Sequence, residues 1–155
     1  MKNVTVILLG FIGLVSTPSF AQSAMADNLV FGDQSKAAAT DGQQTAYFAN
    51  GNKKMTYTVA AGQVTGAITY NYENGSVKET GAMYKGMKNG TWEKFNTSGK
   101  KISVANFKND QKDGTWQIWD DNGTLRYEME YRNGNKTGTW KIWDEKGSLV
   151  EEKAY

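Results

Sequence analysis

The 155-residue sequence contains no cysteine, no histidine and only one proline. Without cysteine the chain has no disulfide, thiolate metal site or thiol nucleophile, and without histidine it lacks the commonest general base and metal ligand. Charge of one sign is not in excess either, since 18 Lys and Arg residues face 16 Asp and Glu residues. A nucleic-acid-binding protein usually shows a clear basic excess. We therefore expect no enzyme, no metal, no cofactor and no nucleic-acid partner.

Acidic side chains give no convincing catalytic or metal site. Glu128 and Glu130 stand two residues apart on one predicted strand, but no insertion beside them would form the cleft that acid–base catalysis needs. The segment 120–123, DDNG, lacks the alternating acids and the distal glutamate of a calcium loop. Its residues are those of a turn.

The N-terminus has the three regions of a secretory signal peptide. A basic second residue precedes an apolar run at 4–15, and small residues lie three and one positions before an expected cut after Ala21. The run is shorter than the ~20 residues that span a bilayer, and no cysteine follows it to carry a lipid. We expect residues 1–21 to be removed and the protein to be exported, periplasmic or secreted, and not a lipoprotein. Residues 22–41 are expected to be a linker or N-terminal cap, with one capping strand at 29–31.

From residue 42 onward the sequence repeats every 24 residues without a gap. Two series of glycines mark the repeat, and they are Gly42, Gly66, Gly90, Gly114 and Gly138, and Gly51, Gly75, Gly99, Gly123 and Gly147. A fixed period of this length indicates a repeat array. Each unit contains two β-type runs separated by turn residues, which predicts one hairpin per unit. We expect an all-β, elongated antiparallel meander of five hairpin repeats, at 42–65, 66–89, 90–113, 114–137 and 138–155.

The register of these hairpins depends on the turn inside each unit. Asn122-Gly123 favours a two-residue type I′ turn, in which both central residues have positive φ. Counting outward from that turn predicts three cross-strand pairs, namely Ile118 with Tyr127, Trp116 with Met129, and Trp119 with Arg126. The same count in the neighbouring units pairs Phe95 with Ile102 and Trp143 with Val150.

Strand alternation then divides the aromatic residues between two faces. Trp92, Trp116 and Trp140 are predicted to be structural core, two strands apart from one another, with a residue such as Ala105 or Met129 between them. The opposite face is the candidate binding surface, and its residues are Phe95, Trp119, Arg126 and Trp143. The basic residues of the inter-repeat turns are interpreted as solvated, and they are Lys85, Lys88, Lys108, Lys112, Arg132 and Lys136.

The glycine and tryptophan spacing of 114–137, repeated in 138–155, resembles the MORN-repeat variant found in bacterial proteins often described as a YwqK-type antitoxin family. The resemblance covers about residues 42–155 and is stronger over 66–155. It implies an elongated array of β-hairpins used for binding, with no catalytic residues. A neutraliser of a cytoplasmic toxin would not be exported, so the N-terminus favours an envelope role or immunity to a toxin met outside the cytoplasm.

Three kinds of partner remain open from the sequence. We expect a module that binds another protein through a sheet face, and exposed aromatic rows of this kind also suit sugar rings. An envelope carbohydrate-binding module is therefore the first alternative. The basic residues of the turns suggest the second, a peripheral module that contacts the membrane. The sequence does not identify the partner or the oligomeric state.

Overall fold

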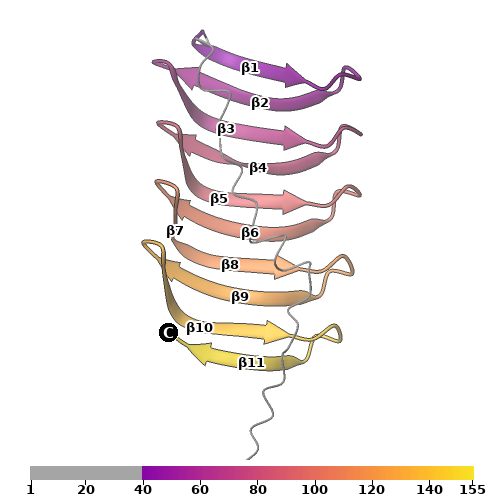
Figure 1. The fold of residues 1–155 in the computed structure, drawn as a ribbon, viewed down its shortest axis with the longest axis vertical. Helices are drawn as coiled ribbons and strands as arrows, with labels where there is room; N and C mark the ends of the chain where they lie inside the picture. The colour runs from indigo at the N-terminus through magenta and orange to yellow at the C-terminus, as the bar shows by residue number, and fades with distance from the viewer. Residues whose placement is uncertain (1–39) are drawn as a thin grey trace, which may run out of the picture.

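The computed structural model describes residues 40–155, which form one open antiparallel sheet (Figure 1). Its strands are β1 Gly42–Tyr47, β2 Lys53–Ala60, β3 Gln63–Asn71, β4 Val77–Tyr84, β5 Met87–Phe95, β6 Lys101–Lys108, β7 Gln111–Lys112, β8 Gly114–Trp119, β9 Leu125–Arg132, β10 Asn135–Trp143 and β11 Leu149–Ala154. The strands follow one another across the sheet in chain order, and the short β7 pairs with β6 beside that path. The expected all-β meander is confirmed. The predicted signal peptide at 1–21 and capping strand at 29–31 lie outside the described residues.

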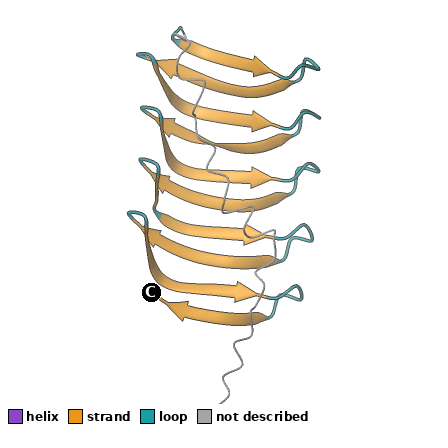
Figure 2. Cartoon of the chain, viewed as in Figure 1, coloured by secondary structure: helices purple, strands orange, loops and turns teal. Residues whose placement is uncertain are grey.

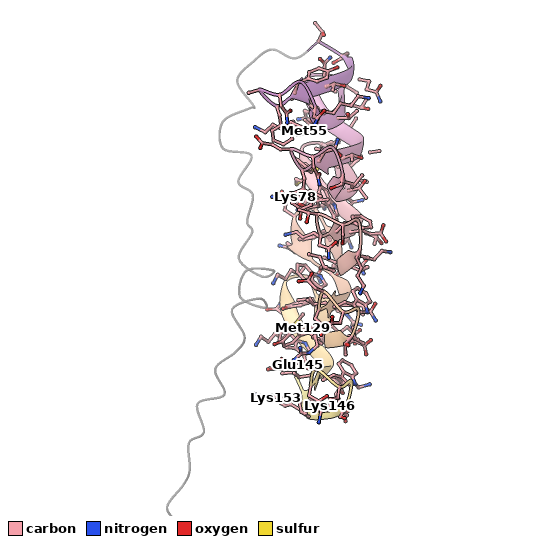
Figure 3. All side chains as sticks on the ribbon, turned by 90° about the vertical axis from the view of Figure 1, so that its right-hand side faces the viewer. Met55, Lys78, Met129, Glu145, Lys146 and Lys153 are labelled. Carbon is pink, nitrogen blue, oxygen red and sulfur yellow. The ribbon has the colours of Figure 1, made fainter. Side chains whose placement is uncertain are left out.

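The sheet is one layer thick. Figure 2 shows strands joined by short loops, and the edge-on view of Figure 3 shows a narrow column of strands with side chains on both faces. No helix or second sheet packs against it within residues 40–155. A lone hairpin is marginally stable in water, so this fold depends on contacts between successive hairpins.

The loop inside each repeat has three residues and is built around a type I turn. In the fourth repeat, the Asp120 amide donates to the Thr124 carbonyl at 3.0 Å, and the Gly123 amide donates to the Asp120 carbonyl at 2.9 Å. Gly123 has φ of 91°, whereas Asn122 is not among the described residues with positive φ. The same two hydrogen bonds recur in all five repeats. Glycine is therefore required at one loop position, which explains why every copy keeps it.

The two-residue turn predicted at Asn122-Gly123 is therefore wrong, and so are the pairs next to it. Trp119 lies opposite Leu125, not Arg126. Phe95 and Trp143 likewise lie opposite Lys101 and Leu149.

The deeper pairs are nevertheless as predicted, with Ile118 opposite Tyr127 and Trp116 opposite Met129. The extra loop residue shifts the register by one, and a bulge between Ile118 and Trp119 that leaves Arg126 unpaired shifts it back. The two errors cancel before the core begins.

Type I′ turns lie instead between the repeats, at the opposite ends of the strands from the three-residue loops. Asn133 and Gly134 have φ of 48° and 82°, and Lys85 and Gly86 have φ of 50° and 79°. Each turn is also tied to the preceding repeat, since the Gly134 amide donates to the Lys112 carbonyl at 2.8 Å. The three-residue loops at the other ends of the strands are also linked from repeat to repeat, for example by the Asn74 side chain donating to the Thr97 carbonyl at 3.3 Å. Backbone and turn bonds therefore join each repeat to its neighbour.

Two clusters of buried side chains lie along one face of the sheet. The N-terminal cluster contains Met55, Ile68, Met83 and Trp92. The C-terminal cluster contains Ala105, Trp116, Ile118, Tyr127, Met129 and Tyr131. Phe107 is partly buried and packs against both, so it joins the two clusters into one apolar strip. The predicted core assignment of Trp92 and Trp116 agrees with this burial, whereas Trp140 is only partly buried at its margin.

Candidate binding surface

A continuous ladder of six aromatic rings follows the buried face from β5 to the C-terminal end of the array. Its ring centroids are 6.4 Å apart for Trp92 and Phe107, 5.0 Å for Phe107 and Trp116, 5.5 Å for Trp116 and Tyr131, 5.2 Å for Tyr131 and Trp140, and 4.8 Å for Trp140 and Tyr155. We call this set the aromatic ladder. Edge-on and tilted pairs at these distances contribute roughly 0.5–1.5 kcal/mol beyond their buried area.

The rings that bridge the tryptophans come from a position that the sequence reading did not single out. Ala105 and Met129 do lie opposite Trp92 and Trp116, but the bridging rings are two residues further along the return strand. Tyr131 lies opposite Gly114, and Phe107 lies opposite Gly90. A Cβ added at Gly90 would meet nothing within 4 Å, and one at Gly114 would meet Asn106, so the positive φ of these glycines (75° and 97°), and not the facing ring, favours glycine there.

The tryptophan indoles are fixed at both their faces and their polar edges. Trp116 donates its indole N–H to the Asn106 carbonyl at 2.9 Å, and Trp92 and Trp140 make the equivalent bonds to Ala82 and Glu130 at 3.1 Å. A buried indole N–H needs such a partner. These bonds support a structural role for the three tryptophans. Trp92 is only 2% exposed, so it offers almost no surface to a partner in the free protein.

Three equivalent lysines, one from each of the second, third and fourth repeats, lie over the aromatic ladder, and Lys153 also lies 5.1 Å from the last ring, Tyr155. The Lys88 Nζ lies 3.9 Å from the ring centroid of Trp92. The Lys112 Nζ lies 4.5 Å from Trp116 and 4.8 Å from Tyr131. The Lys136 Nζ repeats this arrangement at 4.4 Å from Trp140 and 4.8 Å from Tyr155. We call Lys88, Lys112 and Lys136 the lysine row. These are cation–π distances, each contributing about 0.5–1 kcal/mol when exposed.

The sequence reading treated these lysines as solvated turn residues, and for Lys88 and Lys112 the structure corrects it. Both are partly buried. Lys136 is exposed as a residue, yet its ammonium group still lies over two rings. The signal that would have found them is their constant spacing, since each lysine precedes a tryptophan by four residues in three successive units. The contact between each lysine and its tryptophan ring shows that both residues lie on the same face.

The lysine row differs in charge pairing along its length. Lys88 forms an ion pair with the buried Glu79 at 3.0 Å. Within residues 40–155, neither Lys112 nor Lys136 has a carboxylate at ion-pair distance. Burial lowers the pKa of Lys112, and the nearby positive charge of Lys136 lowers it further. The two C-terminal lysines therefore present adjacent positive charges that repel one another.

The opposite face carries the residues predicted as the binding surface. Phe95, Trp119 and Trp143 are each partly buried, and none is among the fully exposed large apolar residues. Charged and polar groups surround them, including the Lys141–Glu128 pair at 4.0 Å and the hydrogen bond from Gln117 to Glu128 at 2.9 Å. This face is mixed in character, with partly accessible aromatic rings between solvated ion pairs.

Arg126 does not stand beside Trp119 as a free cation. Its Nε donates to the Trp143 carbonyl at 2.9 Å, and its guanidinium pairs with Asp120 at 3.4 Å. Both bonds tie the fourth repeat to the fifth or close its own loop. The structure therefore gives Arg126 a role in joining repeats, in place of the pairing with Trp119 that the sequence predicted.

Within residues 40–155, no group of three His, Cys, Asp or Glu side chains is placed to hold a metal ion. In the same part of the chain, no helix is long and apolar enough to cross a membrane. Glu128 is engaged with Gln117 and Lys141, as described above.

Comparison with protein families agrees with the repeat geometry. Residues 88–109, 112–133 and 136–155 each match the MORN repeat variant. Each matched unit begins at a lysine of the row, so the family's repeat frame keeps each lysine with the tryptophan that it covers. No curated protein sequence matches the chain closely enough to count as a relative.

Proposed function

Because residues 88–109, 112–133 and 136–155 match the MORN repeat variant, we propose that this protein is a non-catalytic module that binds another protein along a face of its sheet. The observation that carries the proposal is the single-layer sheet, whose two faces are uncovered over residues 40–155. Aromatic residues are enriched at protein interfaces. Here they recur along the sheet, so a long partner segment would meet the same groups in each repeat.

Two surfaces compete for that role. The first contains the lysine row with the accessible end of the ladder, where Tyr155 is 46% exposed. The second contains Phe95, Trp119 and Trp143 on the opposite face. The lysine row is the better candidate, because its cations lie in line and two of them have no carboxylate partner among the described residues.

The test is affinity capture with the tagged full chain and two double variants. Trp119→Ala with Trp143→Ala alters one face, and Lys112→Met with Lys136→Met alters the other. Each variant is first checked for an unchanged β-sheet spectrum. We expect one protein to be captured by the parent chain and lost with the lysine variant only. Loss with the tryptophan variant alone would move the site to the opposite face, and capture of no specific protein by any form would contradict the proposed function.

The proposal includes export, supported by the order of basic, apolar and small residues in 1–21. An exported antitoxin-like protein would meet its target outside the cytoplasm, so we propose an immunity-like or envelope-scaffolding role in place of neutralising a cytoplasmic toxin. Cell fractionation and N-terminal sequencing test this. A mature chain beginning at Gln22 outside the cytoplasm is expected, whereas a cytoplasmic chain that keeps Met1 would contradict it.

Carbohydrate and membrane binding are the competing functions. Partly exposed rings such as Trp140 and Tyr155 have the flat shape that sugar rings pack against, and a glycan array tests this directly. Binding to anionic vesicles that weakens with added salt would favour the membrane reading. The near balance of 18 basic and 16 acidic residues gives little general attraction to an anionic surface.

A further inference from the structure

We propose that Lys112 and Lys136 of the lysine row bind an acidic, extended segment of a partner protein, with one carboxylate of that segment bound at each lysine. This inference rests on the proposed function and gives its partner a chemistry. It follows from the pairing, the spacing and the surroundings of the two lysines.

The pairing of the lysines shows which positions are available. Lys88 is already occupied by Glu79 at 3.0 Å. The residues at the corresponding position in the next two repeats are Ser103 and Tyr127, which carry no charge and are both buried. Lys112 and Lys136 thus lie over aromatic rings as Lys88 does, but without a carboxylate partner among the described residues. We call the position of each of these two lysines above its rings a seat. The array contains one example of the ion pair and two seats in which the described residues supply no acid.

The charge balance of the seats favours an anion. The positive charge of Lys136 contributes to lowering the pKa of Lys112, so the two ammonium groups disfavour one another. A ligand that brings negative charge to both would relieve this repulsion. The rings beneath fix the lysine side chains, so less conformational entropy is lost when they bind.

The spacing selects the form of the partner. Equivalent residues of successive repeats lie two strands apart, or about 9.6 Å at the usual strand spacing. A chain in the polyproline II conformation returns to the same side every three residues after about 9.3 Å. An ordinary β-strand turns alternate residues to opposite sides, so it cannot present every third residue to one row. An acidic residue at every third position therefore fits the two seats.

The probe is a fluorescent peptide made of repeated Glu-Pro-Pro units, titrated into the full chain with anisotropy as the readout. A Gln-Pro-Pro peptide has the same backbone and no carboxylates. A third peptide has the same composition, with the glutamates grouped at one end. The two acidic peptides contain three glutamates each, so the grouped glutamates span only about 6.2 Å in the polyproline II conformation and cannot reach both lysines. We expect only the evenly spaced acidic peptide to bind well, with the grouped peptide about tenfold weaker.

Matched variants separate this site from general electrostatics. Lys112→Met with Lys136→Met should weaken binding of the Glu-Pro-Pro peptide by about tenfold or more. Lys108→Met with Lys146→Met removes the same charge from two exposed lysines that are not over the aromatic ladder, and it should change binding by less than about twofold. Equal losses in the two variants, or equal binding of the glutamine peptide, would overturn the inference.

Other occupants give different outcomes. Binding to vesicles of phosphatidylcholine and phosphatidylserine that depends on Lys112 and Lys136, with no peptide binding, would replace the peptide by a membrane. Concentration-dependent dimerisation lost in the same variant would replace it by a second copy. A native partner that the Lys112→Met, Lys136→Met chain still captures would end this inference while leaving the proposed function intact. Failure of the parent chain to capture any partner would end the proposed function.

Discussion

The repeats before Trp92 and those after it use the same backbone with different side chains. Both regions have the same three-residue loops and type I′ turns. The N-terminal cluster is mainly aliphatic, with Met55, Ile68 and Met83, whereas the C-terminal cluster is rich in aromatic residues that continue as a ladder to Tyr155. The fold thus needs only the turn glycines and an apolar strip. The ladder and its lysines are additions confined to residues 88–155.

The comparison also shows that sequence regularity and burial do not coincide. The last repeat keeps the full tryptophan pair, yet Trp140 and Ile142 are only partly buried and every residue of β11 is exposed. The Trp92 repeat has Phe95 in place of the second tryptophan, and Trp92 is among the most deeply buried large side chains. Burial depends on having a repeat on both sides. We therefore expect the centre of the array, and not its C-terminal end, to be the most stable part.

The largest expected effect comes from truncating the tryptophan between the two regions. Trp92→Ala removes a ring that is 2% exposed and contacts Phe107, which packs against both clusters. We expect a loss of about 3–5 kcal/mol in the free energy of unfolding. Trp140→Ala is the matched control, and its partly buried ring should cost roughly half as much. Urea denaturation measures the free energy of unfolding of both variants. Equal losses would show that the repeats at the centre of the array contribute no more to stability than the last repeat.

A smaller loss is expected at the glycine beneath that ring. A Cβ at Gly81 would lie 2.3 Å from the Trp92 indole, and Gly81 does not have the positive φ of the turn glycines. Gly81→Ala should therefore destabilise by overpacking alone, by roughly 1–3 kcal/mol. Combined with Trp92→Leu, which removes the obstructing ring, the added cost of Gly81→Ala should fall close to zero. Additive losses in this double-mutant cycle would contradict the steric explanation.

A gain in stability is expected when a turn of the N-terminal region is given the residue found at the same position of a C-terminal turn. Lys85 has φ of 50°, a conformation that Asn133 adopts at the corresponding position with φ of 48°. Asparagine tolerates this left-handed conformation better than lysine. Lys85→Asn should raise the free energy of unfolding by about 0.5 kcal/mol, and Asn133→Lys should lower it by a similar amount. Asn-Gly is the preferred residue pair in type I′ turns. A loss of stability in Lys85→Asn, or a gain in Asn133→Lys, would therefore exclude this explanation.

The smallest effects concern alkaline pH, where one tyrosine from each region titrates late. Burial raises the pKa of Tyr70, with a further contribution from Glu79, and burial raises the pKa of Tyr131. A folded-state pKa above the unfolded value of 10.0 means that the folded protein holds its protons longer. Their contribution to stability is thus complete below pH 10.0 and is lost as pH rises through the folded pKa values.

The measurement is a tyrosinate absorbance titration, compared with unfolding at the same pH. The raised pKa values of Tyr70 and Tyr131 should appear as late ionisation steps, and Tyr70→Phe and Tyr131→Phe should each remove one late step and reduce the loss of stability above pH 10.0. A titration that neither substitution changes would contradict the burial of these two phenols.

The hairpin array could be predicted from the sequence because its signals are local. A 24-residue glycine period and alternating apolar residues specify hairpins and their order without knowledge of distant contacts. The turn types could not be assigned by residue pair alone, since Asn-Gly occurs both at 122–123 and at 133–134. Which turn forms depends on the adjoining strands and, at Asp120, on a side chain that accepts from the Thr124 amide.

The candidate site was harder to predict because it depends on side-chain directions across neighbouring strands. Trp119 and Arg126 were paired by counting, but one extra loop residue separates them. Each lysine of the row lies over rings of the following repeat, as when Lys112 of the third repeat lies over Trp116 and Tyr131 of the fourth. Spacing alone gives the lysine-to-tryptophan interval. It does not show that a ring from the following strand completes the seat.

The most direct test of the central claim is hydrogen exchange of the backbone amides, resolved by strand, in the free protein. The account predicts the strongest protection in β5–β9, where the two clusters meet, with protection falling toward β1 and toward the exposed β11. Maximal protection in β10 and β11, or uniform protection across the sheet, would contradict it. Either result would show that stability does not depend on having neighbouring repeats on both sides.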